Sequence, residues 1–230
     1  MMEKRSQKTL EDNHAYFDNA YAEGVDIWNR VKERDAAFLS FMQSLRNKKE
    51  YGNLLDIGCG VARHADPTIR AGWSYTGIDY SHLAVEKAIE NLSDEQASVI
   101  ETNFFMFNPE KTFDALVDFG FLIHISKEVY PEYIAKIGQL SHPKSQLLLS
   151  VWSMGSKQMY GFTPTTSTRD FILPGPGGGN LYTRFFDEED LIHMFGAQWE
   201  ISNINRVSIG EESAKDAQGL EFLFVTLQKK

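Results

Sequence analysis

Apolar and polar positions divide this chain into short apolar runs separated by amphipathic stretches. The apolar runs end at glycine, aspartate or asparagine, which is typical of buried strands. In the stretches between them, apolar residues recur at helical spacing, as in Phe38, Phe41 and Leu45. This alternation predicts an α/β protein in which helices cover a mostly parallel sheet.

The pattern places seven strands along the chain. They are predicted near 53–57, 74–79, 97–101, 114–119, 146–151, 198–206 and 220–227. A helical region covers about 10–48, and further helices start near Ala62, Ser81, Pro131 and Asp187. The last of these begins with acidic residues, which suit the positive amino-terminal end of a helix. It ends before Gly196, and glycine commonly follows the carboxyl end of a helix.

The first predicted strand, 53–57, leads into a turn that contains Gly58 and Gly60. These glycines permit a tight turn and leave room for a ligand beside the backbone, because no Cβ stands in the way. The next strand ends at Asp79, 19 positions after Gly60. A carboxylate there can accept hydrogen bonds from both ribose hydroxyls, so the pattern indicates an adenosine-containing cofactor.

Two residues discriminate between the possible cofactors. A dinucleotide fingerprint has a third glycine three residues after Gly60, where this chain has Arg63. Asp56 precedes the first glycine by two residues, and its carboxylate would be a poor neighbour for a pyrophosphate. The same carboxylate suits a cofactor that carries an ammonium and a sulfonium group.

Three segments, in this order, resemble motifs of the class I S-adenosylmethionine-dependent methyltransferases. Residues 56–60 match the first motif, 76–81 match the acidic second-strand motif, and 113–125 are similar to the fourth strand with its following turn. One short glycine pattern is a moderate signal, whereas the three together at proper spacing are strong. The resemblance covers about 51–151 well. It implies a Rossmann-like α/β fold with a seven-stranded, mostly parallel sheet, an antiparallel last strand and helices on both faces.

The resemblance also implies which residues bind S-adenosylmethionine. They are Asp56, Gly58, Cys59, Gly60, Asp79 and Tyr80 around the glycine turn, Asn103 and Phe104 after the third strand, and Asp118 and Phe119 after the fourth. Many family members have an aspartate where this chain has Asn103, but an amide can both donate to and accept from a base edge. Phe104 is either a platform for the adenine or a core aromatic at the strand end.

Two segments outside these motifs are candidates for the acceptor site. Residues 16–28 are rich in aromatics and resemble the leading segment of small-molecule family members, where a helix and a tryptophan cover the cofactor. Ordinary packing of an amphipathic helix is the alternative. Residues 153–184 are long for a connection and glycine-rich, so they form either a lid or a disordered surface loop. The candidate substrate-binding residues are Tyr16, Tyr21, Trp28 and Tyr182.

Length and composition agree with a single domain, since 230 residues with 42% hydrophobic side chains provide an ample core. We expect one methyltransferase domain over 1–230. It consists of a helical amino-terminal cover at 1–50, a cofactor-binding core at 51–152, an insertion or lid at 153–184, and the distal helix and strands at 185–230. No run approaches the ~20 apolar residues of a spanning helix, and the first residues lack the apolar run of a signal peptide. We therefore expect a cytoplasmic protein with no membrane role.

The net charge of −9 argues against a nucleic-acid acceptor, because such enzymes need basic surface for phosphates. The basic cluster at 46–49 is better explained by the end of a helix, where cations complement the helix dipole. The lone Cys59 lies in the cofactor turn, which excludes an internal disulfide and leaves no cysteine nucleophile for methylation of a pyrimidine carbon. We expect a small-molecule acceptor, with a protein side chain as the alternative, and we make no prediction of the oligomeric state.

The implied reaction is an in-line attack of an acceptor lone pair on the sulfonium methyl group, which mainly requires alignment and exclusion of water. An acceptor that carries a proton also needs a base. His124, after the fourth strand, is the candidate by position and pKa. The competing interpretation is a structural role at the sheet edge, which is commoner for such histidines. The six histidines show no metal-ligand spacing, so no metal is predicted.

Two other functions remain open. The first is an S-adenosylmethionine-binding protein without catalysis, acting as a sensor or as the partner of an active subunit, because intact motifs predict binding but not turnover. The second is an NAD-dependent oxidoreductase, which Arg63 and Asp56 disfavour. The choice of acceptor depends on the variable cover and insertion, so fold-level analogy does not supply it.

Overall fold

The structure, a computed structural model, describes residues 13–24, 31–92, 95–156, 163–164, 169–174, 180–209 and 219–230. Its seven long strands are β1 (Asn53–Ile57), β2 (Ser74–Asp79), β3 (Ala97–Glu101), β4 (Phe113–Asp118), β5 (Ser141–Trp152), β9 (Trp199–Ser208) and β10 (Glu221–Lys229). The helices are an amino-terminal helix at 13–22, α2 (Lys32–Lys48), α3 (Ala65–Arg70), α4 (His82–Asn91), α5 (Tyr130–Gln139) and α6 (Glu188–Phe195). Two short 3₁₀ turns, η2 (Leu122–His124) and η3 (Lys127–Val129), connect β4 to α5.

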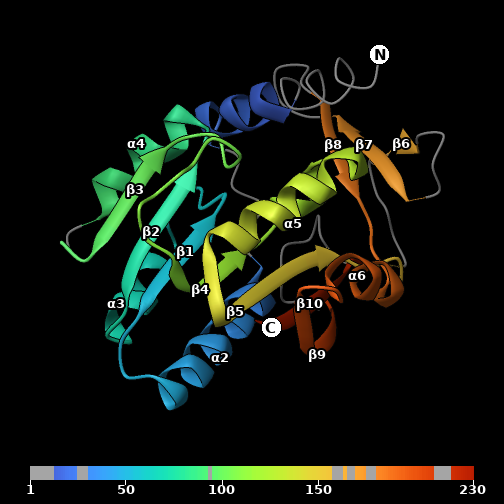
Figure 1. Cartoon of the computed structure of the whole chain (residues 1–230). Coiled ribbons are helices and arrows are strands. Elements are labelled where there is room, and N and C mark those ends of the chain that lie inside the picture. The colour runs from blue at the N-terminus through green and yellow to red at the C-terminus, as the bar shows by residue number, and fades with distance from the viewer. Residues whose placement is uncertain are drawn as a thin grey trace.

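The long strands form one sheet in the order β3-β2-β1-β4-β5-β10-β9 (Figure 1). The first five in this order pair in parallel with their neighbours. The last strand of the chain, β10, pairs antiparallel with both β5 and β9. The predicted α/β fold with an antiparallel last strand is therefore confirmed.

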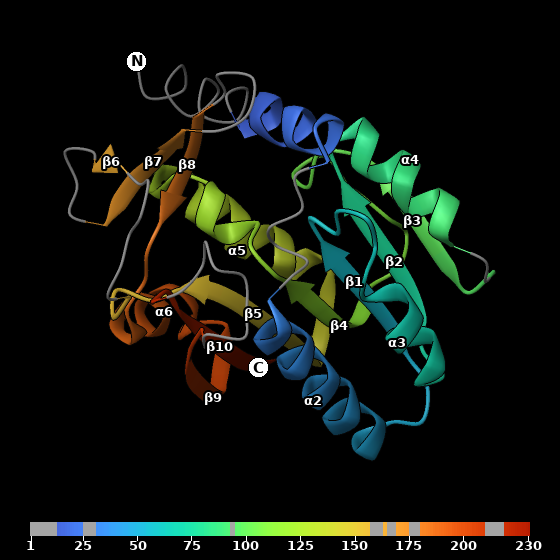
Figure 2. The same ribbon diagram turned by 180° about the vertical axis from the view of Figure 1, so that it is seen from behind.

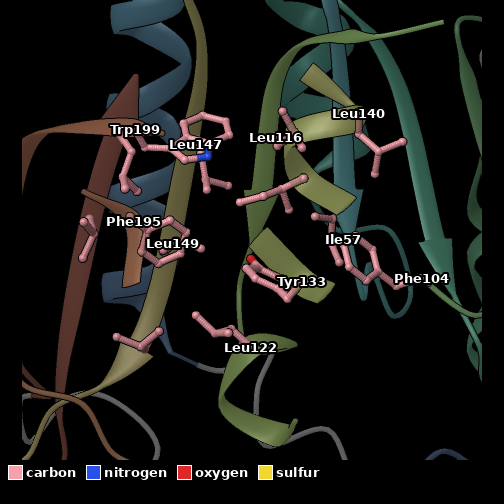
Figure 3. Packing of buried hydrophobic residues seen from close by; sticks show 14 of the residues in the cluster. Ile57, Phe104, Leu116, Leu122, Tyr133, Leu140, Leu147, Leu149, Phe195 and Trp199 are labelled. Carbon is pink, nitrogen blue, oxygen red and sulfur yellow. The ribbon is translucent and has the colours of Figure 1, made fainter. Parts of the chain in front are cut away.

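Side chains that alternate along the strands build a core on each face of the sheet. Leu55 of β1 packs in a cluster that contains Tyr133 of α5 and Phe195 of α6. Leu54, its neighbour, belongs to a second cluster with Phe38 of α2. Figure 3 shows the first cluster between β4, β5 and the helices, and Figure 2 shows α2 and α3 on the other face. This two-sided burial explains why the strands read as continuous apolar runs.

The predicted boundaries hold within a residue for β1 to β4, whereas β5 starts earlier than predicted, at Ser141. Its first residues are polar and carry an irregularity in the pairing with β4. The hydroxyl of Ser145 donates to the carbonyl oxygen of Phe113 at 2.7 Å and accepts the N–H of His142 at 3.0 Å. These hydrogen bonds hold a polar segment in the sheet, which an apolar pattern does not reveal.

Lys144 in this segment has a φ of 76°, in the left-handed region that favours glycine. The Lys144→Gly substitution is expected to raise the free energy of unfolding by about 0.5 to 1 kcal/mol. Glycine relieves roughly 1 to 2 kcal/mol of backbone strain in the folded state. This gain exceeds the ~0.4 to 1 kcal/mol that glycine costs by making the unfolded chain more flexible. Thermal unfolding should show a midpoint higher by about 2 °C. Lys144→Ala retains the strain and should show no gain, and equal midpoints for the two variants would contradict this account.

Three described segments within 153–184 form a small antiparallel sheet, β6 (Thr163–Pro164), β7 (Asp170–Pro174) and β8 (Asn180–Arg184). These parts of the predicted insertion are thus strands and not an irregular loop. Both ribbon views place this small sheet and the amino-terminal helix beyond the same edge of the large sheet (Figures 1 and 2). Asn13 connects the two, because its Oδ1 accepts the backbone N–H of Tyr182 at 3.0 Å.

Candidate functional site

A cavity lies at the carboxyl ends of β1, β2, β4 and β5, where ligands bind in open parallel sheets. One half is lined by the glycine turn after β1 and by the end of β2. The other half is lined by the turn after β4, by β5 and by the start of β10. The amino-terminal helix, the start of α2, η2 and the small sheet contribute further walls among the described residues.

The glycine turn has the geometry that its sequence predicts. Gly58 and Gly60 adopt φ values of 67° and 55°, which favour glycine. The N–H groups of Gly58 and Cys59 donate to the carbonyl oxygen of Ile78 at 2.9 and 3.0 Å. Burial raises the pKa of the Cys59 thiol well above its ordinary value, so the thiol is protonated at neutral pH. The turn lines the cavity with backbone and with a neutral side chain.

Asp79 joins the glycine turn to the end of β2. Its two carboxylate oxygens accept the backbone N–H groups of Gly60 and Ser81, each at 2.9 Å. Burial raises the pKa of the Asp79 carboxyl above its ordinary value. Tyr80, which follows, also lines the cavity, and its hydroxyl is buried without a hydrogen-bond partner among the described residues. This end of the cavity therefore offers a carboxylate and a phenol to a ligand.

Asp56 lies buried beneath the turn, where its Oδ2 accepts the hydroxyl hydrogen of Tyr75 at 2.8 Å. The Nδ1 of His64 lies 2.9 Å from the same oxygen and therefore donates to it. Burial lowers the pKa of His64 despite the adjacent Asp56, so the imidazole is neutral. Sequence reasoning identified Asp56 but missed Tyr75 and His64, since neither follows from the glycine pattern.

Asp118 lies behind the cavity wall and not on it. It is fully buried at the end of β4 and accepts backbone N–H groups from Gly120, Phe121 and Leu122 at 2.8 to 3.3 Å. The hydroxyl of Tyr133 adds a fourth hydrogen bond at 2.8 Å. Burial raises the pKa of Asp118 to about 6. Asp118, predicted to touch the cofactor, thus shapes the turn. Its neighbour Phe119 lines the cavity, and contact between Phe119 and the cofactor stays a prediction.

Asn103 and Phe104 are also absent from the described cavity wall. Phe104 is buried in the core, with its ring 5.0 Å from that of Phe121, which agrees with the second of the two roles left open for it. The Oδ1 of Asn103 accepts the N–H of Phe105 at 2.9 Å and so stabilises the turn after β3. Contact between Asn103 and an adenine stays a prediction.

The amino-terminal helix covers the cavity through Asn13, Phe17 and Tyr21. Tyr21 lies close over the glycine turn, since its hydroxyl is 2.6 Å from the position that a Cβ at Gly60 would take. Tyr16 is buried against Phe17 and does not line the cavity. Trp28 lies outside the described residues. Of the predicted aromatic cover, the structure thus places Tyr21 at the cavity.

His124 lines the cavity between the turn after β4 and the small sheet. Its Nδ1 lies 2.9 Å from the carbonyl oxygen of Tyr182 and therefore carries the proton of that hydrogen bond. Burial lowers the pKa of His124 to about 4. Leu181 and Thr183 face the cavity from β8, so the side chain of Tyr182 lies on the opposite side of the strand. Tyr182 contributes its backbone, and not its ring, to this region.

Arg34 of α2 is a cavity residue that sequence reasoning missed. It is 8% exposed and donates from Nη2 to the carbonyl oxygen of Phe119. Its guanidinium lies 5.2 Å from the ring centre of Phe119 and 5.8 Å from that of Phe222. The sequence did indicate that Arg34 is buried, because it precedes Phe38 by four residues and so lies on the same face of α2.

The described residues contain no group of three or more side chains placed to hold a metal ion. Within the same part of the chain, no helix combines the length and the apolar character that crossing a membrane requires. The charged and titratable side chains that line the cavity include the carboxylates Asp56 and Asp79, the arginines Arg34 and Arg63, and the histidines His64 and His124.

The family model and the relatives that match this chain are all described as methyltransferases. A family model described as a methyltransferase domain matches residues 28–198, well over half of the chain. A Schizosaccharomyces pombe protein named as an uncharacterized methyltransferase is 31% identical over 122 residues, which are 52% of this chain and 84% of that protein. A Bacillus cytotoxicus protein with the same designation is 26% identical over 158 residues, which are 69% of this chain and 73% of that protein.

Solved structures agree with the fold. A Burkholderia thailandensis 1,6-didemethyltoxoflavin-N1-methyltransferase, crystallised with 1,6-didemethyltoxoflavin and S-adenosylhomocysteine, superposes with a TM-score of 0.73. It is 20% identical, and the match covers 98% of this chain and 90% of that one. A Methanosarcina mazei methyltransferase has a TM-score of 0.65 at 19% identity, over 79% of this chain and 93% of that one. At these identities the likeness concerns the fold alone.

Proposed function

Because this chain belongs to the methyltransferase-domain family, we propose that it transfers the methyl group of S-adenosylmethionine to a small-molecule acceptor by direct in-line displacement. The observation that carries the proposal is one cavity that extends from Asp79, past the glycine turn, to an apolar region lined by Trp152 and Phe222. Such a cavity can hold a nucleoside cofactor and a second molecule side by side. The Burkholderia protein, which was crystallised with two such molecules, supports this assignment by analogy.

The residues at the first half of the cavity fit S-adenosylmethionine. Asp79 would accept hydrogen bonds from the ribose, and the buried hydroxyl of Tyr80 lacks a partner that a ligand could supply. Asp56 gives the region a negative charge, which favours the ammonium and sulfonium groups of this cofactor over a pyrophosphate. When bound, the cofactor supplies an electrophilic methyl group on its sulfonium.

The chain's own residues hold the cofactor and the acceptor, align them and enclose them. The amino-terminal helix is fixed over the cavity by the hydrogen bond from Ser81 Oγ to Asp18 at 2.6 Å and by Lys87 Nζ, which donates to the carbonyl oxygen of Tyr21 at 2.6 Å. Enclosure excludes water and strengthens electrostatic interactions within the site. Alignment of the attacking atom with the methyl group then accounts for the main part of the rate enhancement.

His124 acts in this proposal as a positioning residue. A histidine with a pKa of about 4 is a weak base at neutral pH, and its Nδ1 proton is committed to Tyr182. Its backbone carbonyl accepts the side-chain amide of Asn13 at 2.6 Å. His124 therefore joins the amino-terminal helix to the small sheet, and the acceptor loses any proton to another group or to solvent.

The His124→Asn variant separates the two roles. Its amide retains a donor near the Nδ1 position but has no basic nitrogen, so the kcat for methyl transfer is expected to fall less than about fivefold. Loss of a general base would lower kcat by roughly 10² to 10⁴. Steady-state kinetics with S-adenosylmethionine and an accepted substrate measure this difference, and His193→Asn on the surface of α6 is the control. A fall of a hundredfold or more would assign His124 as the base.

The wild-type protein and His124→Asn should also differ in how their free energy of unfolding depends on pH. Because the pKa of His124 is lowered in the folded protein, the neutral imidazole contributes stability that is lost as pH falls from about 6.5 toward 4. Between pH 7 and pH 5, the wild-type protein should lose about 1 to 2 kcal/mol more than His124→Asn. Urea unfolding at the two pH values tests this, and equal losses would contradict the burial of a neutral histidine.

The proposed function is tested by incubating the protein with isotopically labelled S-adenosylmethionine and a metabolite extract, followed by mass detection of labelled products. A labelled small molecule whose formation depends on the protein would support methyl transfer. Binding of S-adenosylhomocysteine without any labelled product would favour the alternative of a non-catalytic binding protein. Stabilisation by NAD instead would favour the oxidoreductase.

A further inference from the structure

Arg34 has no ion-pair partner among the described residues. No carboxylate there lies within ion-pair distance of its guanidinium, although Asp56, Asp118 and Asp35 act on it from farther away. Its Nε is buried without a hydrogen-bond partner among the same residues. Burial and the neighbouring Arg63 lower its pKa to about 9, so the group still carries its proton at neutral pH. A buried cation whose charge only distant carboxylates compensate is unfavourable, and an anionic ligand in direct contact with it would add to that compensation.

A second polar group in the same cavity lacks a partner. Ser150 of β5 is buried, lines the cavity, and its hydroxyl makes no hydrogen bond among the described residues. A carboxylate accepts hydrogen bonds from both a guanidinium and a hydroxyl. Arg34 and Ser150 together therefore provide donors of the kind that a carboxylate requires.

The surfaces around these donors are aromatic. Trp152 stacks on Phe222 with ring centres 4.5 Å apart and an angle of 21° between the planes, and both line the cavity. Phe119 completes this side, and Leu173 and Leu181 approach it from the small sheet. A flat ring against such walls buries apolar area and gains from aromatic contact, worth about 0.5 to 1.5 kcal/mol beyond burial.

The position of Arg34 in the sheet separates it from the ribose end of the cofactor site. Asp79 is at the end of β2, whereas Arg34 lies between the rings of Phe119 after β4 and Phe222 of β10. Two strand steps separate β2 from β4 and four separate β2 from β10, which is roughly 10 to 19 Å at the usual spacing. Arg34 therefore lies well away from the ribose end, in the part of the cavity that the proposal assigns to the acceptor.

We infer that the methyl acceptor is a flat aromatic compound that bears a carboxylate, with the carboxylate on Arg34 and Ser150 and the ring against Trp152 and Phe222. This inference rests on the proposed function and names the substrate class of the same site. The chain's net charge of −9 does not attract an anion from a distance, so the selection is local to this cavity.

The test uses two probes of the same shape, 2-naphthoate and its neutral counterpart 2-naphthamide. Each is titrated calorimetrically into the full chain saturated with S-adenosylhomocysteine. The naphthoate is expected to bind about tenfold or more tightly than the amide, as for a charge-assisted hydrogen bond. In Arg34→Met this preference should disappear, while affinity for S-adenosylhomocysteine stays within about threefold of the wild-type value.

Two conservative variants keep the test decisive if Arg34→Met does not fold. Arg34→Lys retains the charge but not the planar fork, so the preference for naphthoate should shrink but persist. Ser150→Ala should weaken naphthoate binding and leave naphthamide binding unchanged. Unchanged naphthoate affinity in both variants would overturn the inference.

The remaining outcomes are distinguishable. Equal affinity for the two probes, binding of neither, or a preference that survives in Arg34→Met would overturn the aromatic acid as acceptor while leaving methyl transfer intact. Loss of tenfold or more in S-adenosylhomocysteine affinity in Arg34→Met would assign the arginine to the cofactor's own carboxylate. Failure of the wild-type protein to bind S-adenosylhomocysteine would instead overturn the proposed function itself.

Discussion

Replacement of Asp79 by alanine is expected to remove the stabilisation that S-adenosylhomocysteine gives the wild-type protein. At a ligand concentration ~100 times the dissociation constant, that stabilisation is about 2.7 kcal/mol, or roughly 5 to 10 °C in the unfolding midpoint. The variant loses the carboxylate proposed to hold the ribose, and the N–H groups of Gly60 and Ser81 lose their acceptor. We expect the affinity to fall at least about a hundredfold, as measured by thermal unfolding with and without ligand.

Two further variants show whether this loss is specific. Asp79→Asn retains an oxygen acceptor for the turn and should bind with intermediate affinity. Asp66→Ala removes a carboxylate from the surface of α3, where the side chain is 74% exposed, and should leave the ligand-induced shift unchanged. Because each shift is measured against the same variant without ligand, a lower basal midpoint does not affect the comparison. A full shift in Asp79→Ala, or an equal shift with NAD, would contradict the proposed cofactor site.

Asp118→Ala is expected to lower the free energy of unfolding by about 3 to 5 kcal/mol, which is the range for removing one partner from a buried charged network. Three backbone N–H groups and the Tyr133 hydroxyl would lose their shared acceptor. The unfolding midpoint should fall by about 6 to 20 °C. Tyr133→Phe removes a single hydrogen bond of the same network and should cost only about 1 kcal/mol.

The pH dependence of Asp118 has the opposite sign to that of His124. Its pKa is about 6 in the folded protein, above the ordinary value, so the protonated form contributes stability that is present below pH ~4 and lost as pH rises through 6. Urea unfolding across this range should therefore show a decrease in the wild-type protein that is absent from Asp118→Asn. A similar decrease in both proteins would contradict the burial of this carboxyl.

The strands could be predicted from the sequence because of how they are buried. Strands covered on both faces, such as β1 and β4, are mostly apolar and end at an aspartate or just before a glycine. The start of β5 could not be predicted from the sequence, because Ser141 and its polar neighbours join the sheet through side-chain hydrogen bonds. The hydrogen bond from Ser145 to Phe113, 32 positions away, helps to hold that segment in the sheet and leaves no local pattern in the sequence.

Some residues of the candidate site could likewise be predicted from the sequence, and others could not. Gly58, Gly60 and Asp79 follow from local spacing, since a turn and the next strand fix their relative positions. The strand pattern also located Asp118 at a strand end, but it did not determine that its side chain turns toward the backbone behind the wall. Arg34 and Phe222 meet only through the strand order, which brings residues from both ends of the chain to one cavity.

Asn13 joins the two elements that cover the cavity, the amino-terminal helix and the small sheet, through its hydrogen bonds. Its amide donates to the carbonyl oxygen of His124, and its Oδ1 accepts the N–H of Tyr182, so the amino-terminal helix and the small sheet share one set of hydrogen bonds. We expect the two covers to open together, when this set breaks along with the hydrogen bonds of Ser81 and Lys87 to the helix. Entry of the acceptor and departure of the spent cofactor are then expected to occur in one opening event, which would set the turnover rate whenever chemistry is faster than opening.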